Sequence, residues 1–175
     1  MPIYVIKNPE RLRWADLTTV LHQPVDHGVP VDAHTKFGYN IPDGFGARRV
    51  DGQFGMTFPD GWQIIIRPKG KVWDRANRTA NLLAHEELHY FFGYITARAM
   101  VNELLALRVA EPRLLQSALY TAAGVHLVQS AEALDEQYDD DTSHGTDAAE
   151  QRRWKTAIDQ CLLDPNATQL LGLAL

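Results

Sequence analysis

Two histidines and a glutamate stand close together near the middle of the chain, in the pattern His-Glu-x-x-His formed by His85, Glu86 and His89. On a helix each residue turns by about 100°, so His89 lies roughly 40° from His85 and one turn further along. Two imidazoles at this spacing can bind one zinc ion, because neutral imidazole is a good zinc ligand. Glu86 would lie beside the metal, where its carboxylate can take the proton of a bound water. The pattern therefore predicts a metal site suited to hydrolysis.

A helix over residues 75–92 is predicted to position these side chains, with Asp74 as its N-cap. Gly93 is expected to end this helix in a left-handed C-terminal cap. Thr96 is the predicted N-cap of the next helix, over residues 97–110. Because the expected turn closely follows the second histidine, the next helix can double back over the histidines and bring a further ligand to them.

The β-prone segment, the motif helix and the following helix together resemble the zincin metallopeptidases, over roughly residues 61–110. In that family the two motif histidines bind zinc and the glutamate is the general base. The resemblance therefore implies that His85 and His89 are metal ligands and that Glu86 is the catalytic residue. It also implies that Gln63 to Arg67 form the strand along which an extended peptide substrate pairs. The implied function is a zinc-dependent metallopeptidase, with one zinc ion as cofactor and a protein or peptide as substrate.

A third metal ligand is implied by one branch of that family, the gluzincins. They take it from a glutamate on a downstream helix, often within an Asn-Glu pair, and Asn102-Glu103 resembles this pair. Gly93 lies about 6 Å along the helix from His89, so a return helix that begins near Ala97 would bring Glu103 back across this distance. Four other side chains are open alternatives for the third ligand: Glu132, Glu136, His126 and His144. Three tyrosines are candidates for stabilising an oxyanion: Tyr94, Tyr120 and Tyr138.

The length and composition of the chain predict one α+β domain over residues 1–175, with a zincin-like fold implied by the resemblance. Residues 1–72 are expected to form a small, twisted and mostly antiparallel sheet. Residues 73–175 are expected to be mainly helical and to include the active-site helix.

The sheet-rich part contains two segments whose structure the turn residues predict. Residues 47–58 and 61–67 are predicted as a hairpin with a turn at Pro59-Asp60-Gly61. Residues 24–46 are rich in proline and glycine and contain His27 and His34. They are predicted as a long loop, which is either a plain surface loop or the rim of the site.

The helical part continues with a break predicted at Gly124 and a helix over residues 125–138. The acidic residues 139–147 are predicted as a solvated loop, because they lack the spacing of a calcium-binding EF-hand. Asp147 is the predicted N-cap of an amphipathic helix that ends before Pro165. The apolar face of that helix consists of Trp154, Ala157, Ile158, Cys161 and Leu162.

The overall charge and hydropathy limit the partners that we expect. The formal net charge is -5, which does not favour nucleic acid. No run approaches the ~18 apolar residues of a membrane span, so no membrane association is expected. Met1 to Lys7 lack the pattern of a signal peptide, which predicts a cytoplasmic protein, although export without an N-terminal signal is compatible with this sequence.

Three other functions compete with the metallopeptidase. One is a catalytically inactive zincin-like module for binding or regulation, in which the metal is structural or absent. The second is a small zinc hydrolase similar to peptide deformylase, which has the same motif but takes a cysteine upstream of it as third ligand, whereas Cys161 lies downstream. The third is similar to the YbeY-type RNA-processing enzymes, whose motif is echoed by Leu88, Gly93 and Tyr94.

Overall fold

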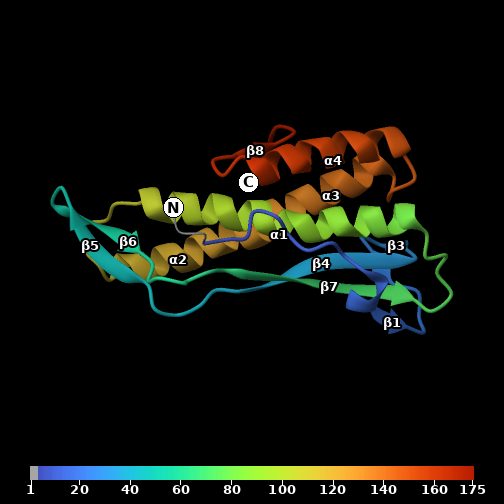
Figure 1. The fold of residues 1–175 in the computed structure, drawn as a ribbon, viewed down its shortest axis with the longest axis horizontal. Helices are drawn as coiled ribbons and strands as arrows, with labels where there is room; N and C mark the ends of the chain where they lie inside the picture. The colour runs from blue at the N-terminus through green and yellow to red at the C-terminus, as the bar shows by residue number, and fades with distance from the viewer. Residues whose placement is uncertain (1–3) are drawn as a thin grey trace.

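A computed structural model describes residues 4–175; residues 1–3 of the predicted sheet-rich region lie outside the described part. The fold is α+β, as predicted. Helix α1 (Ala80–Ala106) runs along the long axis of an elongated molecule, between a sheet and the helices of the C-terminal part (Figure 1). Every residue from His85 to Val101 is buried, so α1 is covered on all its faces. The motif histidines therefore lie on the central helix of the protein.

The main sheet has three strands in the order β1 (Thr18–Val20), β7 (Ile65–Trp73) and β4 (Ala33–Asn40). β1 is parallel to β7 and β4 is antiparallel to it, so the sheet is mixed. β4 is an edge strand, because within residues 4–175 its other edge pairs with no strand. The face of β4 and β7 packs against α1.

The loop predicted over residues 24–46 is wrong, because most of this segment is strand. It contains β2 (Val25–Asp26) and β3 (Val29–Pro30), which pair in a short hairpin, and then β4. The hairpin turns at His27 and Gly28, both with positive φ. In β4, Ala33 and Thr35 are buried at alternate positions, the period of a strand with one face on the core. The prolines lie at the ends of the strands, where the missing N–H is tolerated.

The predicted hairpin also has a different turn and a different partner. β5 (Gly46–Val50) pairs with β6 (Gln53–Thr57), and the chain turns at Asp51 and Gly52, with φ of 49° and 83°. This is the Asp-Gly turn that suits a two-residue hairpin. The segment 61–67 instead leads into β7, which pairs with β4.

Helix α1 begins later and ends much later than predicted. Its N-cap is Thr79, whose hydroxyl accepts a hydrogen bond from the Leu82 N–H at 3.1 Å, rather than Asp74. The helix continues through Gly93 without a break, and it includes most of the residues that were predicted as a separate helix after Thr96. Gly93 is needed for close packing: a Cβ there would lie 2.6 Å from Phe37 Cδ2 and 2.9 Å from Ile66 Cγ2. The glycine thus lets the sheet approach the helix, and it is not a cap.

A second long helical stretch follows, made of α2 (Leu114–Gly124), the π-helical segment η2 (Val125–Ser130) and α3 (Ala131–Thr142). The break predicted at Gly124 does not occur, because the backbone stays helical there, with φ of -62° and ψ of -40°. The acidic loop predicted over residues 139–147 is also partly wrong, since its first four residues form the last turn of α3.

Helix α4 (Ala148–Leu163) confirms the prediction for its segment. The carboxylate of Asp147 accepts hydrogen bonds from the N–H groups of Ala149 and Glu150. Trp154 and Ile158 are fully buried, and the helix ends before Pro165. The chain closes with β8 (Gln169–Leu170) and β9 (Leu173–Ala174). Across residues 4–175, no helix is both long and apolar enough to cross a membrane.

Candidate metal centre

Three ligand-type atoms converge between α1 and α3. His85 Nε2 and His89 Nε2 lie 3.1 Å apart, and Asp139 Oδ1 lies 3.0 Å from the first and 3.1 Å from the second. All three side chains are almost completely buried. The histidines come from successive turns of α1, as the motif predicts, and the aspartate comes from the last turn of α3. His85, His89 and Asp139 could together hold a metal ion.

The spacing of these atoms is compatible with one metal ion bound to all three. In a tetrahedral site with bonds of about 2.0 Å, ligand atoms lie roughly 3.3 Å apart, close to the distances seen here. A neutral His89 that donates from Nδ1 has a bare lone pair at Nε2, and that lone pair faces the negative oxygen of Asp139. The other carboxylate oxygen, Asp139 Oδ2, is buried without a hydrogen-bond partner. A cation between the three atoms would remove this repulsion.

Both histidines are oriented by a second hydrogen bond. His89 Nδ1 lies 2.5 Å from Asp135 Oδ1, and His85 Nδ1 lies 3.2 Å from Gln151 Oε1. When Nδ1 donates its proton to such a partner, Nε2 is left free to bind a metal, and the ring is fixed in position. Asp135 lies one helical turn before Asp139 on α3, so α3 supplies both a candidate ligand and the partner that orients another.

The charges around the histidines shift their pKa values in opposite directions. Burial lowers the pKa of His85. Burial acts in the same way on His89, but the charges and hydrogen bonds of Asp135 and Asp139 more than offset it, and the pKa of His89 is raised well above its usual value. A metal ion at Nε2 would compete with a proton for His89, because it binds the deprotonated ring nitrogen.

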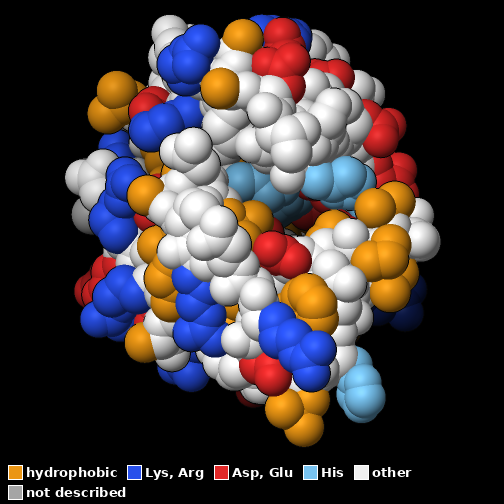
Figure 2. Space-filling view, turned by 90° about the vertical axis from the view of Figure 1, so that its right-hand side faces the viewer, with side chains coloured by type: hydrophobic (Ala, Val, Ile, Leu, Met, Phe, Trp, Pro, Cys, Tyr) orange, Lys and Arg blue, Asp and Glu red, His pale blue; other side chains and the backbone are white. Residues whose placement is uncertain are grey.

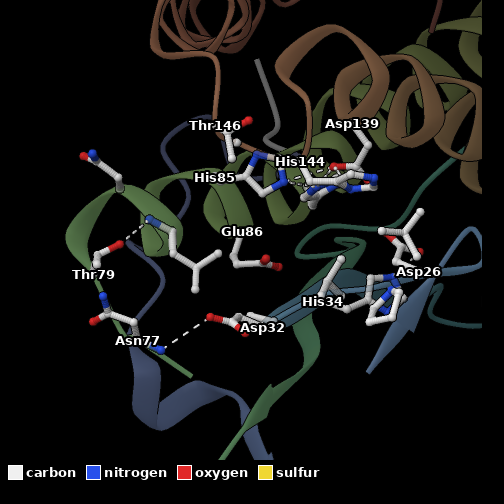
Figure 3. Close-up of a pocket in the computed structure, with 18 of the residues that line it drawn as sticks. Asp26, Asp32, His34, Asn77, Thr79, His85, Glu86, Asp139, His144 and Thr146 are labelled. Carbon is white, nitrogen blue, oxygen red and sulfur yellow. Dashed lines mark hydrogen bonds and ion pairs between the residues drawn. The ribbon is translucent and has the colours of Figure 1, made fainter. Parts of the chain in front are cut away.

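Glu86 projects from α1 into the same cavity as the candidate ligands (Figure 3). Its side chain is 2% exposed, and its Oε2 atom has no hydrogen-bond partner. Burial raises the pKa of Glu86 to about 7, against the lowering effect of the charge on His89. A carboxyl group with such a pKa can accept and release a proton near neutral pH.

The cavity in front of these residues has a volume of about 430 Å³. Figure 2 shows it as a hollow at one end of the molecule, with histidine side chains at its bottom. Its lining includes Asp26, His34, His85, Glu86, Asp139 and His144. Asp26 and His34 come from β2 and β4, so the sheet edge forms one wall and the helices form the other (Figure 3). The site is therefore open to a ligand from outside.

The structure does not bring Glu103 to the histidines. Glu103 lies on the same helix as His89, fourteen residues further on, which places it about 21 Å along the axis. Its side chain is 57% exposed, and Oε2 accepts a hydrogen bond from His126 Nε2 at 2.7 Å. Because α1 does not turn at Gly93, no return helix exists to carry Glu103 back to the site.

The alternative third ligands are also placed elsewhere, with one exception. His126 is bound to Glu103 and to the carbonyl oxygen of Leu175. Glu136 faces His27, and Glu132 lines a separate cavity of about 210 Å³. His144 does line the main cavity, with Nδ1 3.6 Å from Asp139 Oδ1.

None of the three tyrosines proposed for an oxyanion lines the main cavity. Tyr138 is buried and stacks on the His85 ring, with ring centroids 4.7 Å apart. The Tyr94 hydroxyl is close to that of Tyr90, and Tyr120 is exposed. Tyr138 therefore supports His85 on the side away from the cavity, whereas His144 lines the cavity with its Nδ1 atom 3.6 Å from Asp139 Oδ1.

Asp139 was missed because it opens a run of three aspartates, a composition typical of a solvated loop. A signal was nevertheless present. Ala131, Leu134 and Tyr138 recur at helical spacing and are buried, and Asp135 and Asp139 fall on the same stripe. Two aspartates four residues apart match two histidines four residues apart, so two facing helices can bring them into register.

No known protein family matches this chain, and no curated protein or solved structure shows significant similarity to it. The site is therefore defined by its own geometry. It consists of two histidines and an aspartate that could hold a metal ion, with a buried glutamate beside them and an open cavity in front.

Proposed function

We propose that the protein is a zinc-dependent metallopeptidase of the zincin type. The observation that carries this proposal is the convergence of His85 Nε2, His89 Nε2 and Asp139 Oδ1 within about 3 Å of one another, with Glu86 next to them in the cavity. Three protein ligands that leave a position open toward a cavity are typical of catalytic rather than structural zinc sites. Asp139 replaces Glu103 as the third ligand in this proposal.

A zinc ion in this site would act as a Lewis acid and lower the pKa of a bound water. Hydroxide that can attack a carbonyl carbon would then be available near pH 7. Glu86 takes one proton from the attacking water, and it later gives that proton to the amine that leaves when the C–N bond breaks. Its burial suits this exchange, because the protonated and ionised forms are close in free energy near pH 7. His144, at the mouth of the cavity, is the candidate for stabilising the negative charge on the carbonyl oxygen.

The substrate that this cavity suits is an extended peptide. β4 has a free edge and carries His34 into the cavity wall, so a peptide that pairs with β4 would pass the metal ligands. This replaces the expectation that Gln63 to Arg67 serve this purpose, because none of these residues lines the main cavity. Backbone pairing would allow any extended peptide to bind, and the residues at the rim of the cavity would select among the side chains of that peptide.

The test is a comparison of Glu86→Gln with its neighbour Glu87→Gln. Glu87 is equally buried but accepts a hydrogen bond from the Leu12 N–H at 2.9 Å on another face of α1. We expect Glu86→Gln to keep its zinc and to lose hydrolysis of an unfolded protein such as casein by at least about 100-fold, the usual range for a general base. Glu87→Gln should keep both.

Metal analysis by mass spectrometry, on protein without a histidine tag, accompanies the activity measurement. Two histidines and a carboxylate also suit iron(II), so iron in place of zinc would reject the zinc assignment. Full hydrolysis by the Glu86→Gln protein would reject the mechanism. A folded protein that takes up no metal would instead favour a zincin-like binding module.

A further inference from the structure

A second group of ligand-type side chains lies beside the histidines, and none of its members is a metal ligand or the general base in the proposed hydrolysis. It consists of Asp26 on β2, His34 on β4 and Asp135 on α3, whose ligand atoms all lie within 4.8 Å of one another. Asp26 Oδ1 is 3.3 Å from His34 Nε2. Asp26 and His34 line the main cavity, and Asp135 lines the smaller one (Figure 3).

Two polar atoms of this group have no hydrogen-bond partner within the described part of the protein. Asp135 is 5% exposed, and its Oδ2 atom has no hydrogen-bond partner, while its Oδ1 atom is used by His89. His34 Nε2 is also buried without a hydrogen bond, because its contact with Asp26 lacks the required geometry. A buried carboxylate oxygen and a buried imidazole nitrogen that point into one space are ligands that still need a cation.

The charge of the group points in the same direction. Asp26, Asp135 and Asp139 are all at least nine-tenths buried, and Asp26 and Asp139 each have a carboxylate oxygen within 4.8 Å of the other. Lys36 Nζ lies 3.6 Å and His27 Nε2 lies 3.8 Å from Asp135 Oδ2, and both distances exceed that of a hydrogen bond. An ion in the first site would neutralise Asp139 but would leave Asp135 Oδ2 without a hydrogen-bond partner.

We propose that Asp26, His34 and Asp135 bind a second divalent transition-metal ion. Asp135 connects the two sites, because one of its oxygens orients His89 and the other faces the second ion. The second ion joins β2 and β4 to α3, and these elements form opposite walls of the cavity. Its role is to hold the short β2–β3 hairpin against the helix and so to fix the width of the cleft. The proposal does not require that the protein is a peptidase.

The experiment counts metal ions in purified full-length protein. Metal is removed with a chelator, and the protein is titrated with ZnCl₂ in a calorimeter and with CoCl₂ in an absorption spectrometer. We expect about two ions per chain, with the weaker one lost in Asp26→Asn and in His34→Ala. The matched control is His22→Ala, which removes an exposed histidine outside the group and should keep both ions.

A gain of affinity tests the same site without risk from misfolding. Lys36 competes with the second ion for Asp135, so Lys36→Met should tighten the weaker site by at least about tenfold and leave the tighter site unchanged. A wild-type protein that saturates at one ion would overturn the proposal, and so would a second ion that survives both Asp26→Asn and His34→Ala. If that single ion is lost in His85→Ala, the first site and the proposed function still stand.

Discussion

Asp139→Asn distinguishes the candidate metal ligands that the structure brings together from those predicted by the sequence. The substitution keeps the shape of the side chain but removes the negative charge that faces both Nε2 atoms at 3.0 and 3.1 Å. Changing a residue that only orients a metal ligand costs 10- to 100-fold in affinity, so a direct ligand should cost at least about 100-fold, or about 2.7 kcal/mol. Glu103→Gln is the matched control, because it neutralises a carboxylate far from the histidines.

The loss of zinc affinity can be measured as a change in the free energy by which zinc stabilises the folded protein. At a free zinc concentration 100 times the dissociation constant, binding stabilises the wild-type protein by about 2.7 kcal/mol. If Asp139→Asn weakens binding 100-fold, the same concentration stabilises that variant by only about 0.4 kcal/mol. The assay is urea unfolding with zinc and with chelator. The difference between the two conditions removes any effect of the substitution on the metal-free fold.

The two variants should therefore give opposite results in the same experiment. Glu103→Gln keeps the whole zinc-dependent stabilisation, because its amide still accepts the hydrogen bond from His126 and touches no ligand. If Glu103→Gln abolished the stabilisation and Asp139→Asn preserved it, the assignment of the third ligand would be wrong. Loss in both variants would show that zinc binds somewhere else.

Three further results are expected. Asp135→Asn should weaken zinc binding at the first site by 10- to 100-fold, measured by chelator competition, since the charge that orients His89 is lost; unchanged affinity would contradict this role. Gly93→Ala should destabilise the protein by up to about 2 kcal/mol in urea unfolding, because a clash with Phe37 and Ile66 of about 1 to 3 kcal/mol opposes a gain in helix propensity of about 1 kcal/mol; stabilisation would refute the packing argument. Zinc affinity should rise between pH 6.5 and 8 by up to about tenfold per pH unit, because zinc displaces the proton of His89, whose pKa is raised; a flat profile would show that no proton is displaced.

The sequence predicted the parts of the site that depend on local spacing. His85, Glu86 and His89 are separated by less than two turns, so a helix alone brings them together. The third ligand depends on how two helices pack, and no local pattern fixes that. The error began at Gly93, which the sequence presents as a helix end. The contact with Phe37, a residue 56 positions earlier, is the reason for a glycine there, and such a contact cannot be read from the sequence.

For the fold, the sequence predicted the α+β class and the elements that have local signals, whereas it did not predict features that depend on tertiary packing. The amphipathic helix after Asp147 has an N-cap residue and apolar residues in successive turns, so its N-cap and its buried face were both predicted correctly. The strand β4 was missed because prolines and glycines dominate the segment around it, although its own residues alternate between buried and less buried positions. In the β5–β6 hairpin the Asp51-Gly52 turn was present in the sequence, but the later Pro-Asp-Gly signal was preferred.

The π-helical segment η2 changes the rotation of α3 about the helix axis relative to α2, within one continuous helical stretch. A π-turn holds one residue more than an α-turn, so the extra residue rotates everything after it by about 100° relative to everything before it. α2 is anchored on α1 through its own buried side chains, and Asp135 and Asp139 lie beyond the inserted residue. Removal of one exposed residue such as Gln129 would restore regular α-helix and turn both aspartates away from the histidines. The geometry of the candidate metal site thus depends on the number of residues in a segment that contributes no candidate ligand.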